Sequence, residues 1–536
     1  MDTFNIENKG ENVSFPLKNF LENLNNCSSK YWHLIETSTF KTKSILTEAN
    51  LLINEKDKDI QQINKKILNL PLSFPKNAKA IDFLNLFFDE EVWNLLLSET
   101  NVYASQILSE NKKKLKSNSR YKEWKPVTYR EIQIFHGIIL WNGLLSNKDL
   151  NDNWSSNVIF QTNHGKYMSN NRFHLINSFL HLNNNENNHN KDPLHKLRPL
   201  ITMLNSSFEN FYGYDEKLCI DECMIKFNGS LSFKQYIPSK STKHGIKGFL
   251  LCNSVNYYCY QIEIYTGKNE FYKKDNFSSI EQCVIRLCRN VFDKYKIVYM
   301  DSYYTTINLG LYFIQRKTGM IGTMRENRTH LLKQQIPKKK GDYKLLLNVE
   351  RNLTLTAIFD KKVVFVLSNV TIPKMIKVYS KKKGKISKYC KPNVIAEYNS
   401  YSKGVDFCNR RTVNYRYPHK NMKWWKSVYY HLFHLCLNNA FVLYNEFYQL
   451  KIDYKDFYVE IIKSLLGEKK KNKKEKQYHL VNYIDKQKKS VKRLRCRLCS
   501  SLTCWKCKSC SVGNYICSLC IPNCFEQYHE KKYSIV

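Results

Sequence analysis

The sequence lacks any long uninterrupted hydrophobic run. A membrane-spanning helix needs roughly 18 or more consecutive apolar residues, and no stretch of the 536-residue chain is that long. The first residues, Met1–Asn5, also lack the basic and then apolar pattern of a secretory signal peptide. We therefore expect a protein that stays inside the cell and does not have a membrane as its partner.

Acidic residues are scarce relative to basic ones. The chain has 47 Asp and Glu against 85 Lys and Arg, which gives a formal net charge of +38. So many positive charges repel one another in the compact state unless the protein normally binds a polyanion. Nucleic acid is the obvious polyanion. The hydrophobic content of 43% is high enough for packed cores, and the length suits about two to four domains.

Three aspartates stand out because each lies in or directly after an apolar segment. Asp221 lies within the apolar segment 219–227, where an unpaired carboxylate is costly. Asp301 ends the β-branched segment 296–301, and Asp406 follows a valine. Each of them has an ordinary interpretation as a turn or cap residue and a functional one as a ligand of a divalent metal. Their spacing alone does not decide between the two.

The blocks around these aspartates resemble the signature of piggyBac-type transposases and their domesticated relatives. In the order of that family they are Asp221–Met224 with Asn228-Gly229, Lys234–Lys240, Lys243–Lys247, Tyr299–Thr306 and Tyr398–Asp406. The similarity covers residues 75–450 and the cysteine-rich tail. It implies an α/β fold with an RNase H-like catalytic core, in which Asp221, Asp301 and Asp406 hold two Mg²⁺ ions.

The resemblance also implies a function, with one departure from the family pattern. The expected protein is a nuclear, homodimeric cut-and-paste DNA transposase that binds double-stranded transposon ends and cleaves and joins strands at TTAA sites. The family commonly has another acid three positions after the third aspartate, where this chain has Asn409. Asn409 can coordinate a metal but adds no charge. The alternative is therefore a domesticated, catalytically inactive DNA- or chromatin-binding protein with the same fold.

Basic residues near the acidic blocks are the candidates for DNA contact. They are Lys240, Lys243, Lys247, Arg410, Arg411, Arg416, Lys420 and Lys423. Basic and aromatic side chains alternate after Asp406, an arrangement that suits a strand backbone and unstacked bases. For Trp424 and Trp425 a place in a helix core explains the pattern equally well, because an apolar stripe continues after them.

The cysteines indicate a metal-binding tail. Of the 18 cysteines, eight lie within residues 496–524 in paired spacing, which suits a metal better than disulfides in a reducing compartment. Two tetrahedral Zn²⁺ ions need eight ligands, and the candidates are Cys496, Cys499, Cys507, Cys510, Cys517, Cys520, Cys524 and His529. Their order predicts a cross-brace, in which the first and third pairs hold one ion and the second and fourth pairs hold the other.

This tail is expected to bind element ends or a protein such as a histone tail. A zinc-dependent module of the ubiquitin-ligase type would account for the tail alone and would leave most of the chain unexplained. Cysteines outside the tail, such as Cys252 and Cys436, have apolar neighbours and are expected to be small core residues.

Pattern and composition, together with what the resemblance implies, divide the chain into eight segments. We expect a largely flexible region (1–75), a helical DNA-binding or dimerisation region (76–215), the first part of the RNase H-like core (216–325), a β-rich insertion (326–395), the second part of the core (396–414), further DNA-binding helices (415–460), a basic linker (461–493) and the cysteine-rich zinc domain (494–536). Thr128–Glu131 predicts a capped helix start, and 276–292 predicts a helix between two strands.

Overall fold

The chain folds into two compact units, residues 1–467 and residues 468–536. The computed structural model describes residues 33–34, 68–111, 115–147, 149–160, 162–187, 191–238, 240–267, 277–331, 333–348, 352–382, 385–417, 422–468, 480–482, 484–485, 490–491, 493–507, 518–519, 524–525 and 527–528. Several predictions concern positions outside these ranges, namely Lys420, Cys510, Cys517, Cys520, His529 and nearly all of residues 1–67.

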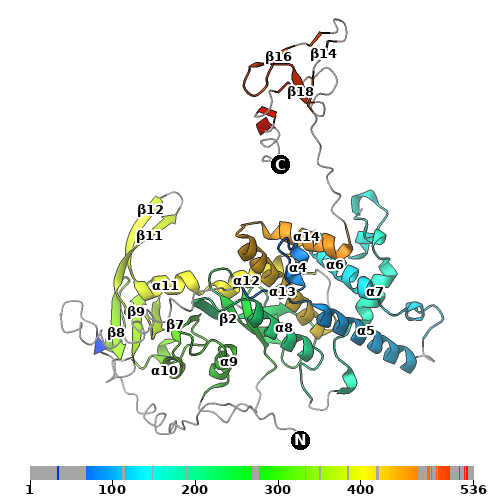
Figure 1. Cartoon of the computed structure of the whole chain (residues 1–536). Coiled ribbons are helices and arrows are strands. Elements are labelled where there is room, and N and C mark those ends of the chain that lie inside the picture. The colour runs from blue at the N-terminus through cyan, green and yellow to red at the C-terminus, as the bar shows by residue number, and fades with distance from the viewer. Residues whose placement is uncertain are drawn as a thin grey trace. The chain divides into compact units, whose positions relative to one another are not determined.

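A ten-stranded sheet is the centre of the larger unit (Figure 1). Its strands are β1 (His33–Leu34), β2 (Lys217–Lys226), β3 (Gln235–Tyr236), β4 (His244–Asn253), β5 (Cys259–Ile264), β6 (Ile297–Met300), β7 (Gly319–Met324), β8 (Tyr343–Asn348), β9 (Leu353–Phe359) and β10 (Val363–Ser368). Their order is β1-β8-β9-β10-β7-β6-β2-β4-β3, and β5 also pairs with β4. The pairs β2–β6 and β6–β7 are parallel and the others are antiparallel. This mixed sheet fits an RNase H-like core.

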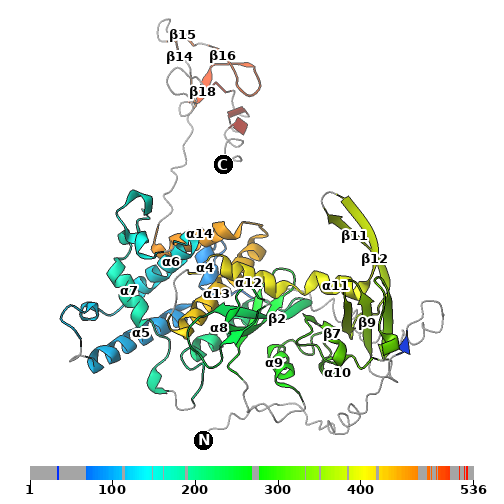
Figure 2. The ribbon, with the colours of Figure 1, turned by 180° about the vertical axis from the view of Figure 1, so that it is seen from behind.

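The parallel part of the sheet is buried because helices cover it. All four residues of β6 are buried, as expected for a continuous apolar run in a strand covered on both faces. In both views of the molecule α9 (Ser279–Leu287) and α10 (Ile307–Gln315) lie below the sheet, whereas α11 (Asn393–Tyr401) and α12 (Gly404–Asn414) lie above it (Figure 2).

The strands of the predicted insertion extend this sheet. β10 pairs with β7, and β9 and β8 follow in antiparallel order. The strands β11 (Met375–Lys382) and β12 (Lys385–Pro392) form a separate two-stranded sheet, which projects from the body in Figure 1. The sequence predicts the β-rich character of this segment but not its continuity with the core, because strand pairing depends on tertiary context.

Helices form the rest of the larger unit. Before the sheet come α4 (Ala80–Leu84), α5 (Glu90–Glu110), α6 (Tyr129–Leu145), α7 (Asn170–Phe179) and α8 (Arg198–Phe211), and after α12 come α13 (Trp424–Tyr448) and α14 (Tyr454–Leu466). The predicted cap of α6 is confirmed, since the Thr128 hydroxyl accepts from the Glu131 amide and the Glu131 carboxylate accepts from the Thr128 amide. The helix predicted at 276–292 is α9, which Ser278 and Glu281 cap in the same way.

The long helix α13 joins the helical region to the sheet. It packs against α4, α8, α12 and α14 and against β2 and β5, and most of its side chains are buried. Trp425 is 2% exposed, so this tryptophan belongs to the core. Trp424 is half-buried, with its ring 5.4 Å from the ring of Phe233. The helix therefore fixes both α12 and the end of β2 to the rest of the fold.

The smaller unit contains short antiparallel strand pairs. They are β13 (Leu480–Asn482) with β18 (Trp505–Cys507), β14 (Ile484–Asp485) with β15 (Ser490–Val491), and β16 (Leu494–Arg495) with β17 (Leu502–Thr503). Its hydrophobic cluster has three buried members among the described residues, Cys496, Cys507 and Leu519. Across the part of the chain that the structure describes, no helix has the length and apolarity to span a membrane.

Candidate active site

Two acids meet because two neighbouring strands are parallel and in register. In the β2–β6 pair Ile220 lies opposite Met300, so the next residues along the two strands are Asp221 and Asp301. Asp301 directly follows the last residue of β6. Residues eighty positions apart in sequence are therefore neighbours across the sheet, as the family resemblance implies for these two aspartates.

A third acid, Glu222, completes a close group. Asp221, Glu222 and Asp301 each place a carboxylate oxygen within 4.8 Å of the others. The sequence prediction did not include Glu222, although it follows Asp221 directly. Consecutive residues of a regular strand point to opposite faces, so strand periodicity gives no reason to expect both carboxylates in one place.

Hydrogen bonds fix this acid group (Asp221, Glu222 and Asp301). The Tyr303 amide donates to the Asp301 carboxylate at 2.8 Å, and the Thr305 hydroxyl donates to the Asp301 carbonyl at 2.9 Å. The hydroxyl of Tyr304, whose side chain is fully buried, donates to Glu222 Oε2 at 3.1 Å. The turn after β6 thus holds two of the three acids in place.

Lys240 lies against the same acids and balances part of their charge. Its ammonium nitrogen is 3.2 Å from Glu222 and 4.0 Å from Asp221. Burial by itself would lower the pKa of Lys240, but the negative charges of Asp221 and Glu222 raise it above its ordinary value. The lysine is therefore firmly protonated, and it forms ion pairs with both acids.

Burial makes the ionised acids costly. It raises the pKa of Asp221, which the Glu222 carboxyl group raises further, and it also raises the pKa of Asp301. Burial acts on Glu222 in the same direction, but its hydrogen bond with Asp221 and the charge of Lys240 lower the pKa of Glu222 below its ordinary value, so that Glu222 is the ionised member of the pair. Carboxylate oxygens are the ligands that Mg²⁺ prefers in proteins, and a divalent cation would offset the repulsion among three of them. The acid group thus fits a divalent metal by its donor set and by its excess of negative charge.

Asp406 lies on α12 and is exposed. The helix packs on β2 and β4 at Gly404, where an added Cβ would lie 2.5 Å from both the Asn253 carbonyl oxygen and Cys219 Sγ. Asp406 contributes, after the nearer acids, to the raised pKa of Lys240, which places it in the same electrostatic neighbourhood. Among the described residues, the carboxylates within 4.8 Å of one another do not include that of Asp406.

Comparisons with known proteins decide the family. A protein-family model described as "Transposase IS4" matches residues 79–441, a range that includes all three predicted aspartates and more than half of the chain. The chain belongs to the piggyBac-type transposase family. The prediction from the sequence blocks is thus confirmed at the level of the family.

Two human relatives and one solved structure resemble this piggyBac-type chain. PiggyBac transposable element-derived protein 3 of Homo sapiens is 25% identical over 472 residues, which cover 84% of this chain and 76% of the relative. PiggyBac transposable element-derived protein 5 of Homo sapiens is 23% identical over 416 residues, 73% of this chain and 76% of the relative. The cryo-EM structure of a piggyBac transposase synaptic complex with hairpin DNA has a TM-score of 0.60 at 21% identity, covering 75% of this chain and 85% of that chain. This last likeness shows the fold.

The predicted DNA-contacting lysines near the acids lie in three different environments. Lys240 binds the acids, as described above. The buried Lys247 has its ammonium 4.1 Å from the ring centre of Tyr303 and 4.7 Å from that of Phe249, so its charge rests on aromatic faces. Lys243 is exposed. Of the three, Lys243 is the one that points a free charge toward solvent.

The predicted arginines and lysine after Asp406 also divide. Arg410 is exposed, whereas Arg411 donates to the Asn256 carbonyl at 3.1 Å and is partly buried in the piggyBac-type body. Lys423 is exposed and donates to the Tyr103 hydroxyl at 3.4 Å. Arg416 lines a pocket beside α13. The described chain therefore offers Arg410 and Lys423 to an approaching polyanion more openly than Arg411.

The tail brings together cysteines from its two ends. One Sγ atom each of Cys496, Cys499 and Cys524 lies within 4.8 Å of the others. The predicted cross-brace would join Cys496 and Cys499 with Cys517 and Cys520, which lie outside the described residues, and would assign Cys524 to the second ion. The observed group instead joins the first pair with Cys524. Three thiolates at this distance suit Zn²⁺, which prefers sulfur ligands in tetrahedral sites.

Proposed function

We propose that this protein is a metal-dependent cut-and-paste DNA transposase. The observation that carries the proposal is the convergence of Asp221, Glu222 and Asp301 at the point where the parallel pairing of β2 with β6 ends, with carboxylate oxygens within 4.8 Å of one another. Family membership supplies the reaction class, and the net charge of +38 supplies the affinity for DNA.

The roles of the acids follow from their positions. Asp221 and Asp301, with Asp406 from α12, are proposed to hold two Mg²⁺ ions, and Glu222 is a further acid within reach. The chemistry that two bound ions supply is activation of water or a 3′-hydroxyl and stabilisation of the leaving oxygen at phosphorus. Tyr304 keeps Glu222 in place by its hydrogen bond.

Lys240 is proposed to keep the acid group folded before metal binds. Its ammonium already contacts Glu222 and lies 4.0 Å from Asp221, and it would be repelled by an incoming cation. Once displaced, it would lie next to the DNA phosphates that the site must hold. A lysine in this position can therefore exchange one anionic partner for another.

The remaining parts of the proposal concern partners and place. We infer that the protein binds double-stranded transposon ends and TTAA targets as a homodimer in the nucleus, with Arg410, Lys243 and Lys423 as exposed DNA contacts. The solved relative named above is described as a synaptic complex with hairpin DNA, which supports DNA as the partner. The tail is proposed to hold two Zn²⁺ ions and to bind element ends or a chromatin protein.

A second candidate function has specific support in Asn409. This position has an amide where the family commonly has an acid, and the Asn409 Oδ1 atom is buried without a hydrogen-bond partner among the described residues. The human relatives carry names that call them transposable element-derived proteins. A domesticated DNA- or chromatin-binding protein without strand-cleaving activity is therefore the competing proposal.

Excision distinguishes the two proposals. A reporter element flanked by TTAA and carrying the cognate terminal sequences would be excised by the wild type and not by Asp301→Ala. In parallel, calorimetric titration with Mn²⁺ should show binding that Asp301→Ala weakens. Excision with this dependence supports the transposase. Absence of both excision and Mn²⁺ binding in the wild type supports the domesticated DNA-binding protein.

A further inference from the structure

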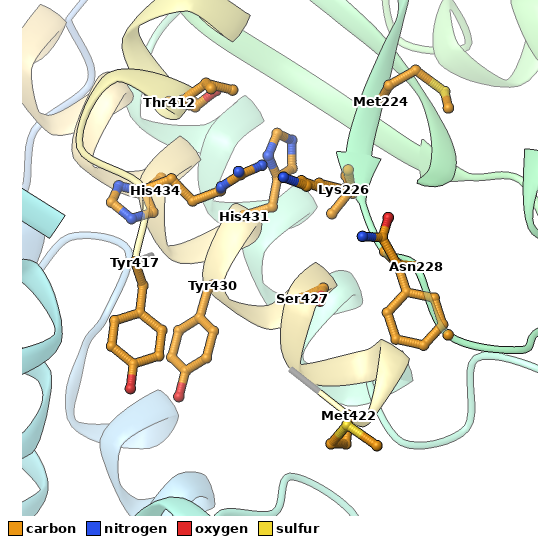
Figure 3. Close-up of a pocket in the computed structure, with 15 residues that line it drawn as sticks. Met224, Lys226, Asn228, Thr412, Tyr417, Met422, Ser427, Tyr430, His431 and His434 are labelled. Atoms are coloured by element: carbon orange, nitrogen blue, oxygen red, sulfur yellow. The ribbon is translucent and has the colours of Figure 1, made fainter. Parts of the chain in front are cut away.

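A pocket of 390 Å³ lies between the end of β2 and the helices α12 and α13 (Figure 3). Met224, Lys226 and Asn228 from β2 and the loop after it line this space together with Tyr430 and His431 from α13, and Figure 3 shows Lys226 next to His431. Met224 is three residues after Asp221, which is about 10 Å along a strand. The pocket therefore begins close to the acid group. Its volume is within the usual range of small-molecule sites.

The side chains that line this pocket combine positive charge with unpaired polar atoms. His434 is 1% exposed, and neither of its ring nitrogens has a hydrogen-bond partner among the described residues. The buried Nε2 atom of His431 also has none. Arg416 is partly buried, and it forms no ion pair within the described parts of the chain. The described residues that line the pocket include no acid.

An arrangement of this kind is costly without a ligand. Buried polar groups in native proteins are normally hydrogen-bonded, and an exception calls for an explanation such as a functional site. Burial lowers the pKa of His434 to about 3, so its ring is neutral and offers one donor and one acceptor. The uncompensated guanidinium of Arg416 favours an anion, most of all a phosphate, which it can bind through two parallel hydrogen bonds.

Aromatic rings form the other part of the wall. Phe227, Tyr417 and Tyr430 line the pocket, and the last two have ring centres 5.4 Å apart. Figure 3 shows these two tyrosines side by side. Stacking on such rings is the general way in which proteins hold an unpaired base. A ligand that brings a flat ring, hydrogen-bonding edges and a phosphate would satisfy the rings, the histidines and Arg416 together.

We propose that this pocket binds a single nucleotide, with its base against the aromatic wall and the histidines and its phosphate at Arg416. The chemistry is common to two sources, a free mononucleotide and an unpaired nucleotide within DNA. The second source rests on the proposed function, because it needs DNA at the acid group. For that source, the pocket would hold one nucleotide out of the helix while the neighbouring phosphate lies at the acids.

Binding measurements on the full chain test this proposal. Fluorescence anisotropy would compare a fluorescein-labelled duplex that carries one unpaired thymidine with the same duplex fully paired, in Ca²⁺ and without Mg²⁺. We expect the wild type to prefer the unpaired duplex by about tenfold, the scale of one stacked base. Arg416→Met and His434→Phe should abolish the preference. Calorimetry with dTMP and with inorganic phosphate would measure binding of a free nucleotide.

Matched variants separate this site from general electrostatics and from folding. Arg410→Met removes the same charge from an exposed position on α12 and should weaken both duplexes equally. His434→Phe keeps an aromatic ring beside Tyr458 and removes two unpartnered nitrogens, so its melting temperature should not fall. A histidine with a structural role alone would give a variant with unchanged binding and a lower melting temperature.

The outcomes identify the source or overturn the proposal. Binding of dTMP that depends on Arg416 identifies a free nucleotide, and a preference for the unpaired duplex without dTMP binding identifies DNA. The proposal is overturned if the wild type neither binds dTMP nor prefers the unpaired duplex, or if both properties persist in Arg416→Met and His434→Phe. Asp301→Ala should keep the preference for the unpaired duplex. If the wild type shows this preference but does not excise the reporter element, the transposase proposal is wrong and the nucleotide-binding pocket is still supported.

Discussion

The acid group of the larger unit and the cysteine group of the smaller unit both gather candidate metal ligands, but the number of buried residues around them differs. Asp221 and Asp301 are anchored by β2 and β6 within a sheet whose residues are buried by helices on both faces. Among the described residues of the smaller unit the buried cluster has three members, Cys496, Cys507 and Leu519, and Cys496 itself belongs to the cysteine group. In the larger unit the fold positions the acids, whereas in the described part of the smaller unit cysteines make up most of the buried cluster.

This difference predicts opposite roles for a metal. Burial of a large core offsets the conformational entropy lost on ordering the acids, and no ion is needed for this. A metal at the acid group is therefore expected to add reactivity to a structure that is already folded. A unit with so few apolar contacts depends on metal-ligand bonds for its stability. The following experiments test whether a metal has a different role in each unit.

The largest effect is expected on removing metal from the tail. Chelation, or Cys499→Ser, should unfold the smaller unit while the larger unit keeps its melting temperature. The measurement is hydrogen exchange of the full chain, with zinc content followed by atomic absorption. If tail amides stay protected after the metal is gone, the tail has a core of its own and the contrast fails.

Next in size is the effect of Asp301→Ala on strand cleavage. We expect a loss of more than about 100-fold, because even partners behind metal ligands affect activity by 10- to 100-fold. Thermal stability should be unchanged or higher, since a buried carboxylate with a raised pKa is removed. Glu326→Ala, at an exposed acid, is the control and should retain cleavage. A large drop in melting temperature would mean that the acid is part of the fold.

A smaller effect is expected for Lys240→Met. Loss of the only cation that is within 4.0 Å of Asp221 and Glu222 in the described structure should lower the melting temperature without metal. It should also tighten Mn²⁺ binding by about tenfold, because the competing charge is gone. Calorimetry with Mn²⁺ measures the affinity. Weaker Mn²⁺ binding would show that Lys240 orients the acids and does not compete with the metal.

The smallest effect is expected where α12 packs on the sheet at Gly404. In Gly404→Ala the new methyl group would meet the Asn253 carbonyl and Cys219 Sγ at 2.5 Å, and overpacking of this kind costs about 1–3 kcal/mol. Gly165→Ala is the control, since its nearest neighbouring atom is 3.9 Å away. Denaturant unfolding gives the free energy of unfolding for both. Equal stabilities would show that α12 shifts freely on the sheet.

The sequence predicted the parts of the site that depend on local pattern. Asp221 and Asp301 were expected on strands because apolar, β-branched residues surround them, and the cap at Thr128 was expected from hydrogen-bonding chemistry within one helical turn. Parallel strands in register then bring the two aspartates together. The convergence itself came from the resemblance, since no local pattern encodes which strands are neighbours.

What the sequence could not predict depends on tertiary contacts. Glu222 joins the acid group although strand periodicity points it away from Asp221. Arg411 belongs to a run of basic residues, yet its side chain is bound to the Asn256 carbonyl, and a charge pattern cannot show direction. The pocket beside α13 combines residues from three separate elements, so the pattern of any single segment does not predict it.

The attachment of β8–β10 to β7 has a consequence for recognising relatives of this chain. In the segment between the second and third aspartates, β8, β9 and β10 extend the sheet outward on the side of β7 that faces away from β6. The chain then returns through α11 to α12. Strands can be gained or lost at that outer margin while Asp301 and the seat of α12 stay where they are. We therefore expect relatives of this chain to differ in the length of the interval between these two aspartates, and a search that relied on that length would overlook them.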